Sequence, residues 1–208
     1  MNAEKVLKAL AGRVPASSVD YCIEVWRRYD FDFRLRKSRV TKVGDFTIRA
    51  GRAPRITVNQ DLHPYLFLTT YLHEVAHVAV HHHFGSRVAG HGQEWKAAFQ
   101  QILEPVLTES IFPNELLSAI RRHMADPPAT TFSDPELTRV FRKFDPQAIA
   151  MIFLSDIPEG AVFGLRGRWF KKGKTQRTRA VCLEVKSKRR YLVPVDSPVE
   201  NVQLSLIV

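Results

Sequence analysis

The hydrophobic and polar positions in the N-terminal part of the chain predict two helices followed by three short strands. Apolar residues recur at helical spacing over residues 4–11 and 16–29. Apolar and polar residues then alternate over residues 31–37 and 43–49, and residues 55–59 form a third β-prone run. The pattern therefore indicates a small sheet that comes after a helical start.

A long apolar stretch, YLFLTTYLHEVAHVAVHHHF, follows at residues 65–84 and contains no helix-breaking residue. Asp61 offers a helix cap before it, and Pro64 suits the first turn of a helix. A helix that is apolar on nearly every side is stable only when protein surrounds it. This stretch therefore predicts a buried central helix that ends near Gly85.

The character of the chain changes at about residue 125. Before that point, the pattern predicts a loop and two further helices, at residues 85–92, 93–103 and 113–123. After residue 160, β-prone runs alternate with polar turns. We expect an α+β fold in three parts. These are a first domain with a small mixed sheet and flanking helices at residues 1–125, a linker with a short helix at 126–150, and a small antiparallel β module at 151–208.

The positive charge of the chain is concentrated in the predicted β module. Residues 160–192 contain eleven Lys and Arg residues against one acid, Glu184, and so account for the whole net charge of +10. Charge localised in this way is typical of a surface that binds nucleic acid. The candidate nucleic-acid contacts are Arg166, Arg168, Lys171, Lys172, Lys174, Arg177, Arg179, Lys188, Arg189 and Arg190.

Aromatic residues lie among these bases and allow two interpretations. Trp169, Phe170 and Tyr191 could stack on unpaired bases, or they could form the core of a small domain. A second basic set spans residues 27–55, where Arg34 and Arg36 alternate with apolar residues. That set could extend a track for phosphates or form an ordinary solvated face.

The sequence gives no sign of membrane insertion or secretion. It has no run of 18 apolar residues, and its N-terminus lacks the apolar core of a secretory signal. Cys22 and Cys182 lie far apart and form no disulfide framework. We therefore expect a cytoplasmic protein without a membrane partner, associated with the nucleoid if the source is bacterial.

Five histidines within residues 73–85 point to a metal site. His73 and His77 are four residues apart, so on a helix both imidazoles emerge on one face, one turn apart. Glu74 completes the pattern HExxH, in which two histidines bind zinc and the carboxylate serves as a base. The alternative is a set of helix histidines that are satisfied by hydrogen bonds.

A catalytic zinc ion needs a third protein ligand. His91 follows a loop with glycines that could turn the chain back over the metal. His83 has the spacing of another zinc-protease pattern, but Val80 replaces the glycine that would turn the chain there. A downstream carboxylate is the remaining option, and the candidates are Glu94, Glu104 and Glu109. We favour His91.

The segments HEVAH at 73–77 and HGQEWKAAF at 91–99, separated by thirteen residues, resemble the SprT-like zinc metalloprotease family. RITVNQDL at 55–62 is similar to the strand that enters the family's active-site helix. The resemblance extends over about residues 15–125 and implies a zincin-like domain. It also implies that His73, His77 and His91 hold one zinc ion and that Glu74 is the catalytic base. The family is associated with DNA-dependent cleavage of proteins bound or crosslinked to DNA, so the resemblance implies protein substrates, DNA as a partner and a role in DNA–protein crosslink repair.

The C-terminal region departs from the family pattern. Many members end in a zinc ribbon with four cysteines, whereas this region has only Cys182. We expect a metal-free module held by an apolar core of Phe163, Leu165, Trp169, Val181, Leu183, Tyr191 and Val193. Two other functions stay open. The protein could be a vestigial, zinc-stabilised nucleic-acid-binding module, or a zinc hydrolase of small amides whose basic tail only docks it. In each case we expect a monomer.

Overall fold

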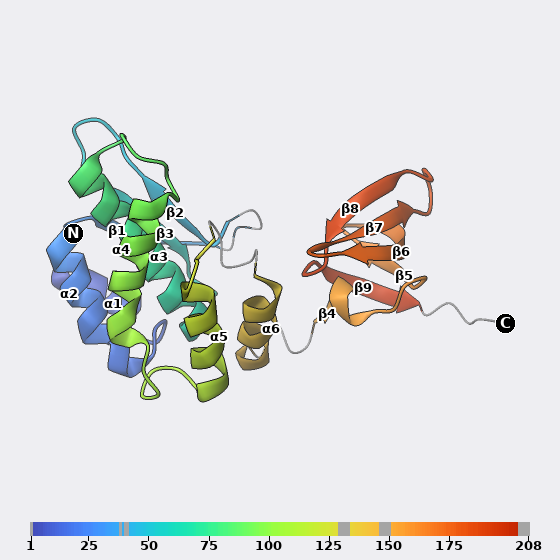
Figure 1. Cartoon of the computed structure of the whole chain (residues 1–208), viewed down its shortest axis with the longest axis horizontal. Coiled ribbons are helices and arrows are strands. Elements are labelled where there is room, and N and C mark those ends of the chain that lie inside the picture. The colour runs from blue at the N-terminus through green and yellow to red at the C-terminus, as the bar shows by residue number, and fades with distance from the viewer. Residues whose placement is uncertain (1, 38, 40–41, 129–133, 146–150, 204–208) are drawn as a thin grey trace. The chain divides into compact units, whose positions relative to one another are not determined.

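The computed structural model describes residues 2–37, 39, 42–128, 134–145 and 151–203 (Figure 1). The chain divides into two compact units, Met1–Thr130 and Thr131–Val208. The division falls within the segment 126–150, which the sequence pattern assigned to a linker and short helix. Helices and strands are mixed along the chain, which confirms the α+β class.

The first unit contains five α-helices and three strands among its described residues. The helices are α1 (Ala3–Leu10), α2 (Val19–Tyr29), α3 (Pro64–Phe84), α4 (Gln93–Leu103) and α5 (Asn114–Met124), with short 3-10 turns η1 (Ala16–Ser18) and η2 (Glu104–Val106). The strands are β1 (Asp32–Arg36), β2 (Gly44–Thr47) and β3 (Arg55–Asn59). These bounds agree with the sequence prediction to within a few residues, because each element has a clear hydrophobic period.

The strands form a mixed sheet in the order β1-β3-β2. β1 pairs with β3 in parallel, with Phe33 opposite Ile56, and β2 pairs with β3 in antiparallel, with Phe46 opposite Ile56. β3 is therefore the buried central strand, and β2 is an edge strand that packs on α3. This arrangement brings β2 next to the helix that carries the HExxH pattern.

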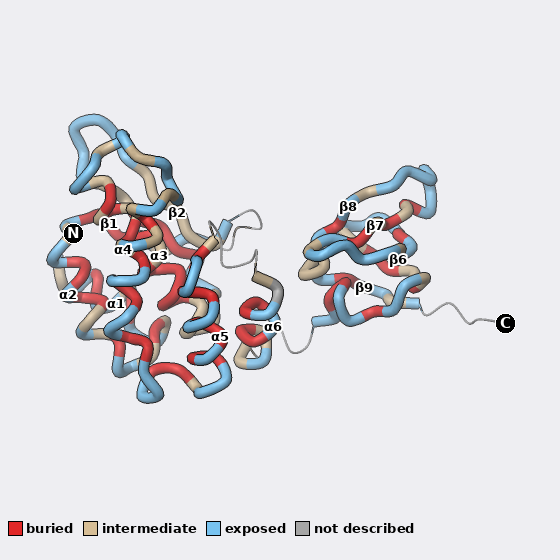
Figure 2. Tube along the Cα trace, in the orientation of Figure 1, coloured by how far each residue is buried: buried red, intermediate tan, exposed pale blue. Residues whose placement is uncertain are grey.

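Helix α3 is the core of the first unit (Figure 2). Residues 67–72 are all buried, so every face of its N-terminal half is covered. Its cap differs from the prediction, because the side chain of His63, not Asp61, accepts from the backbone N–H of Tyr65. His63 directly precedes Pro64 and so holds the position that a capping side chain requires.

Among its described residues, the second unit contains one α-helix and an antiparallel sheet. The elements are α6 (Pro135–Phe144), β4 (Ile152–Phe153), η4 (Leu154–Asp156), β5 (Val162–Leu165), β6 (Arg168–Gln176), β7 (Arg179–Glu184), β8 (Arg190–Pro194) and β9 (Pro198–Gln203). The sheet order is β4-β9-β5-β6-β7-β8. Arg142 of α6 donates to the Asp196 carbonyl and lies 3.5 Å from the Phe153 ring centroid, so α6 belongs to this unit.

The core of the second unit corrects part of the prediction. Phe163 and Val193 are buried as expected, and Leu165 and Tyr191 pack against them. In β7, however, Ala180 and Cys182 face the core, while Val181 and Leu183 are only partly buried. Trp169 is 40% exposed and lies outside the core. A strand presents alternate residues to opposite faces, so the register of the β6–β7 hairpin decides which set is buried.

Candidate metal centre

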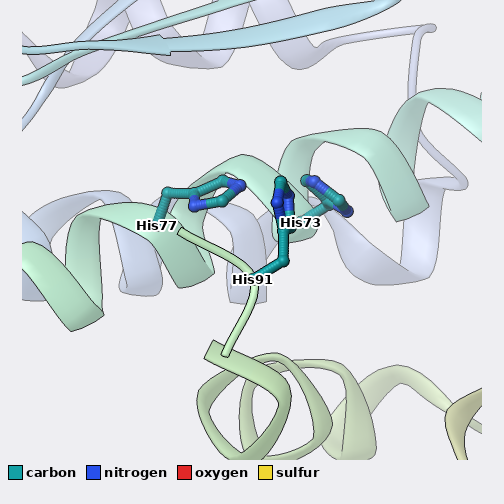
Figure 3. A group of neighbouring side chains, drawn as sticks. All are labelled: His73, His77 and His91. Carbon is teal, nitrogen blue, oxygen red and sulfur yellow. The ribbon is translucent and has the colours of Figure 1, made fainter. Parts of the chain in front are cut away.

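Three histidines from two segments meet beside helix α3. His73 and His77 lie one turn apart on α3, and His91 comes from the loop between α3 and α4 (Figure 3). Their ligand nitrogens all lie within 4.8 Å of one another. The chain reversal at residues 85–92 brings His91 back to the helix, beside His73 and His77.

The other candidate ligands lie elsewhere. Within the part of the chain that the structure describes, the group of neighbouring metal-ligating side chains contains His73, His77 and His91 only. His83 lies in the last turn of α3, exposed and against the ring of Phe84. The carboxylates that stayed open as third ligands are not in the group; they are Glu94, Glu104 and Glu109.

Aromatic side chains pack against the three imidazoles. Trp95, on the first turn of α4, is fully buried, and its ring centroid lies 4.6, 5.4 and 4.7 Å from those of His73, His77 and His91. Phe46 of β2 stacks on His77 with 5.8 Å between centroids and 7° between planes. His77 thus packs against aromatic rings from β2 and from α4. The packing of Trp95 and Phe46 against the metal-ligand candidates was not predicted from the sequence. A signal for Trp95 was present, because it lies four residues after His91, in the first turn of the next helix.

Glu74 points toward the sheet and is 7% exposed. Strand β2 passes so close that a Cβ built on Gly44 would lie 2.4 Å from Oε1 of Glu74 and 2.7 Å from Cγ2 of Thr70. Any side chain at position 44 would therefore displace the carboxylate. The glycine gives β2 its close approach to the HExxH helix.

Burial sets the protonation of these groups. It lowers the pKa of His73 to about 3 and that of His77 to about 4, with neighbouring histidines adding to both shifts. The pKa of His91 is lowered by burial as well. All three rings are thus neutral at pH 7, which is the state that binds a metal. Burial and the nearby Asp45 raise the pKa of Glu74 to about 8, against the opposing charges of Arg39 and Lys42.

The donor set fits a divalent transition metal. In a tetrahedral site with metal–nitrogen distances of ~2.1 Å, the ligand nitrogens are roughly 3.4 Å apart. The ligand nitrogens, which all lie within 4.8 Å of one another, are close to that spacing. Three neutral imidazoles leave one coordination position open, as catalytic sites require. These three histidines could therefore hold a metal ion.

A buried helix with two histidines and a carboxylate, completed by a third histidine, defines a candidate metal-dependent hydrolase site. The model of the SprT-like family matches residues 21–114, which run from α2 to the start of α5 and include the whole histidine group. This part of the chain is therefore similar to the SprT-like family, which is associated with metalloprotease activity. No curated protein and no solved structure matches the chain. No helix among the described residues is long and apolar enough to cross a membrane.

Two of the ten candidate nucleic-acid contacts have structural partners instead. Lys172 is 6% exposed, and its Nζ donates to the carbonyls of Leu154 and Ile157 at 2.7 Å each. Nε of Arg168 donates to Oε1 of Glu184 at 2.6 Å. Lys172 shares the inward face of β6 with buried Phe170, so strand parity turns its charge toward the unit's interior. Arg168 stays exposed, but its guanidinium is paired with Glu184.

The other eight candidates are exposed on the second unit. They are Arg166, Lys171, Lys174, Arg177, Arg179, Lys188, Arg189 and Arg190. The aromatic residues divide, because Phe170 is buried, Tyr191 packs against the core, and Trp169 is exposed. In the second basic set, Arg34 and Arg55 both donate to Asp32, at 2.9 and 2.7 Å, which offsets part of that charge.

Proposed function

We propose that the first unit is a zinc-dependent peptidase with a zincin-like active site. The observation that carries this proposal is the convergence of His73, His77 and His91 to within 4.8 Å, on a helix where buried Glu74 directly follows His73 in the HExxH pattern. A structural metal site has no use for such a carboxylate, whereas peptide hydrolysis needs a base at this place.

The three histidines would hold the zinc ion. Three imidazoles with one open position are typical of catalytic zinc, and the borderline-soft nitrogen donors suit it better than they suit magnesium or calcium. When bound, the ion supplies Lewis acidity toward a water molecule and a carbonyl oxygen. Trp95 and Phe46 fix the orientation of the imidazoles that receive it.

Glu74 moves the proton in this proposal. Its carboxylate accepts a proton from the attacking water and then delivers it to the leaving amine. Burial raises the pKa of Glu74 and so favours the protonated form that the carboxyl group takes after this first transfer. Gly44 leaves the space in which that carboxylate stands.

The edge strand β2 favours a protein over a small amide as substrate. β2 pairs with β3 along one of its edges, and its other edge is the edge of the sheet. Phe46 of this strand stacks on His77. An extended peptide can add to such an edge through backbone hydrogen bonds. A peptide bound along β2 therefore runs past the metal ligands.

The exposed cations of the second unit support binding to nucleic acid. Phosphate contacts need accessible Lys and Arg side chains, and eight of the candidates meet that condition. We infer that the enzyme is a cytoplasmic monomer that cleaves proteins bound or crosslinked to DNA, with the second unit holding the DNA.

The test compares wild type with Glu74→Gln on a DNA-binding protein substrate, with and without DNA, by gel. Cleavage by wild type alone, with equal zinc content in both proteins, is the expected result. Full activity of Glu74→Gln would reject the mechanism. Absence of cleavage under every condition in zinc-loaded wild type would favour the vestigial binding module.

A further inference from the structure

Strand parity gives the second unit an outer sheet face that its core does not use. On β6, β7 and β8 the inward positions are the buried ones, such as Phe170, Cys182 and Val193. The alternate positions point outward. These outward positions, with Val185 directly after β7, form the outer face. They are Trp169, Lys171, Arg179, Val181, Leu183, Val185, Arg190, Leu192 and Pro194.

The strand register joins these residues into one surface. Leu183 lies opposite Lys171 on one side and Arg190 on the other, and Val181 lies opposite Leu192. The backbone N–H of Val185 donates to the Trp169 carbonyl at 2.9 Å, so these two exposed side chains start from neighbouring positions. Three cations therefore surround a continuous apolar strip.

The apolar strip is unusually accessible. Trp169 and Val185 are each 40% exposed, and Leu192 is 54% exposed. Small domains normally keep such side chains inside, and a contiguous exposed patch with a polar rim marks an interaction surface. An indole at its edge offers a flat ring of large area with little conformational entropy to lose.

The charge of this face selects an anionic partner. From Arg168 to Pro194 the only acidic residue is Glu184. Its side chain points inward and accepts from Arg168, so it does not neutralise the outer face. Lys171, Arg179 and Arg190 are all exposed there.

We propose that the outer face of β6–β8 binds single-stranded DNA, with an unpaired base stacked on Trp169 and phosphates held by Lys171, Arg179 and Arg190. This inference rests on the proposed role of the second unit in holding DNA, and it selects one surface and one form of DNA. Aromatic stacking needs a free base face, which duplex DNA hides within its stack, whereas the cations need only phosphates.

The rigid setting of Trp169 supports this role. Arg168, its neighbour in sequence, is anchored by Glu184, which also accepts from Ser187 of the next hairpin. Phe170, on its other side, is buried in the core. The backbone that presents the indole is therefore held on both sides, so little order is lost when a base binds.

The experiment measures the affinity of the full-length protein for a single-stranded thymidine oligonucleotide as a function of salt. Trp169→Ala should weaken binding about tenfold to hundredfold with an unchanged salt slope, since stacking is worth ~1–3 kcal/mol per base. Trp169→Phe should retain most of the affinity. Phe84→Ala removes a 37% exposed aromatic ring from the first unit and serves as the matched control, with no expected effect.

The charge contacts have a separate readout. Lys171→Glu with Arg190→Glu should reduce the slope of log affinity against log salt by about 1.4, at ~0.7 per phosphate on a single strand. Lys5→Glu with Lys8→Glu, at exposed positions on α1, makes the same change in net charge and should leave the slope unaltered.

Four results overturn the proposal. If Trp169→Ala binds the oligonucleotide as tightly as wild type, or if duplex DNA binds as tightly as the single strand, the outer face is not the binding surface for single-stranded DNA. Salt-dependent binding would then still support the nucleic-acid role of the second unit. If single-stranded RNA binds in preference to DNA, the partner is wrong. If no nucleic acid binds, this inference and that part of the proposed function fail together, while peptidase activity is judged by the Glu74→Gln comparison.

Discussion

The indole of Trp95 lies 4.6 Å, between ring centroids, from the imidazole of His73 and is completely buried. Trp95 also contacts His77 and His91, so one side chain packs against every ring of the candidate metal centre. Its Nε1 has no hydrogen-bond partner among the described residues, so its part in the site is packing.

This packing predicts different outcomes for two substitutions. Trp95→Ala should destabilise the protein by about 3–5 kcal/mol, because it leaves a large cavity. It should also weaken zinc binding by roughly 10–100-fold, as loss of a group that orients the ligands does. Trp95→Phe keeps an aromatic ring and loses no hydrogen bond, so we expect near wild-type zinc affinity. Competition with a chromophoric chelator and thermal unfolding measure the two effects; equal zinc affinity of Trp95→Ala and wild type would reject the positioning role.

Gly44 should be essential for activity although it carries no functional group. In Gly44→Ala the new methyl group would lie 2.4 Å from Oε1 of Glu74, so the carboxylate must move. A displacement of about 1 Å can cost roughly 100-fold in rate, and we expect such a loss with the zinc content unchanged. Gly90→Ala is the matched control, because its Cβ meets nothing within 4 Å. Peptidase rate and bound zinc are measured on the same samples, and an active Gly44→Ala enzyme would contradict the geometry.

Removal of the metal should lower the stability of the first unit. A ligand that binds only the folded state adds about 2.7 kcal/mol at a free concentration 100 times its dissociation constant. A chelator should therefore lower the thermal midpoint of unfolding, and added zinc should restore it. His91→Ala should largely lose this response, since it removes one of the three donors. His83→Ala, outside the group, should keep it.

The buried Lys172 should matter for stability and not for DNA binding. Lys172→Met preserves the length of the side chain but leaves the carbonyls of Leu154 and Ile157 without their donor. The expected loss is about 1–3 kcal/mol for each buried group left unsatisfied. The folded Lys172→Met variant should bind DNA with wild-type affinity. Lys171→Met, one position away on the exposed face, should bind DNA more weakly and have the thermal stability of wild type. The reverse pattern would contradict the strand parity.

The Arg168–Glu184 pair predicts how the second unit responds to acid. Hydrogen bonds from Arg168 and Ser187 lower the pKa of Glu184 from 4.5 to about 2. A carboxyl group whose pKa is lower in the folded state stabilises that state above its unfolded value. This contribution is therefore complete above about pH 4.5 and is lost as the pH falls toward 2. Thermal unfolding between pH 6 and pH 2, compared with Glu184→Gln, tests this, and we expect the two curves to converge at the acid end.

Much of the first unit is readable from local patterns. The 3.6-residue and two-residue periods predict α2, β1 and α3 to within a few residues, because each element buries one face or all of its surface. The HExxH spacing also places His73 and His77 on one face, since helical geometry is local. His91 could be favoured but not placed, because the path of a loop depends on what it packs against.

The sequence by itself determined the elements, the basic character of the C-terminal region and the donors of the candidate metal centre. Only the tertiary structure decided that Gly44 faces Glu74 and that Trp95 lies under all three histidines, because these contacts join segments far apart in the chain. It also decided that Lys172 and Phe170 are buried, whereas their sequence neighbours Lys171 and Trp169 are exposed. The composition does not distinguish between such neighbours. A strand turns successive side chains to opposite faces, and the register of the sheet decides which face is buried.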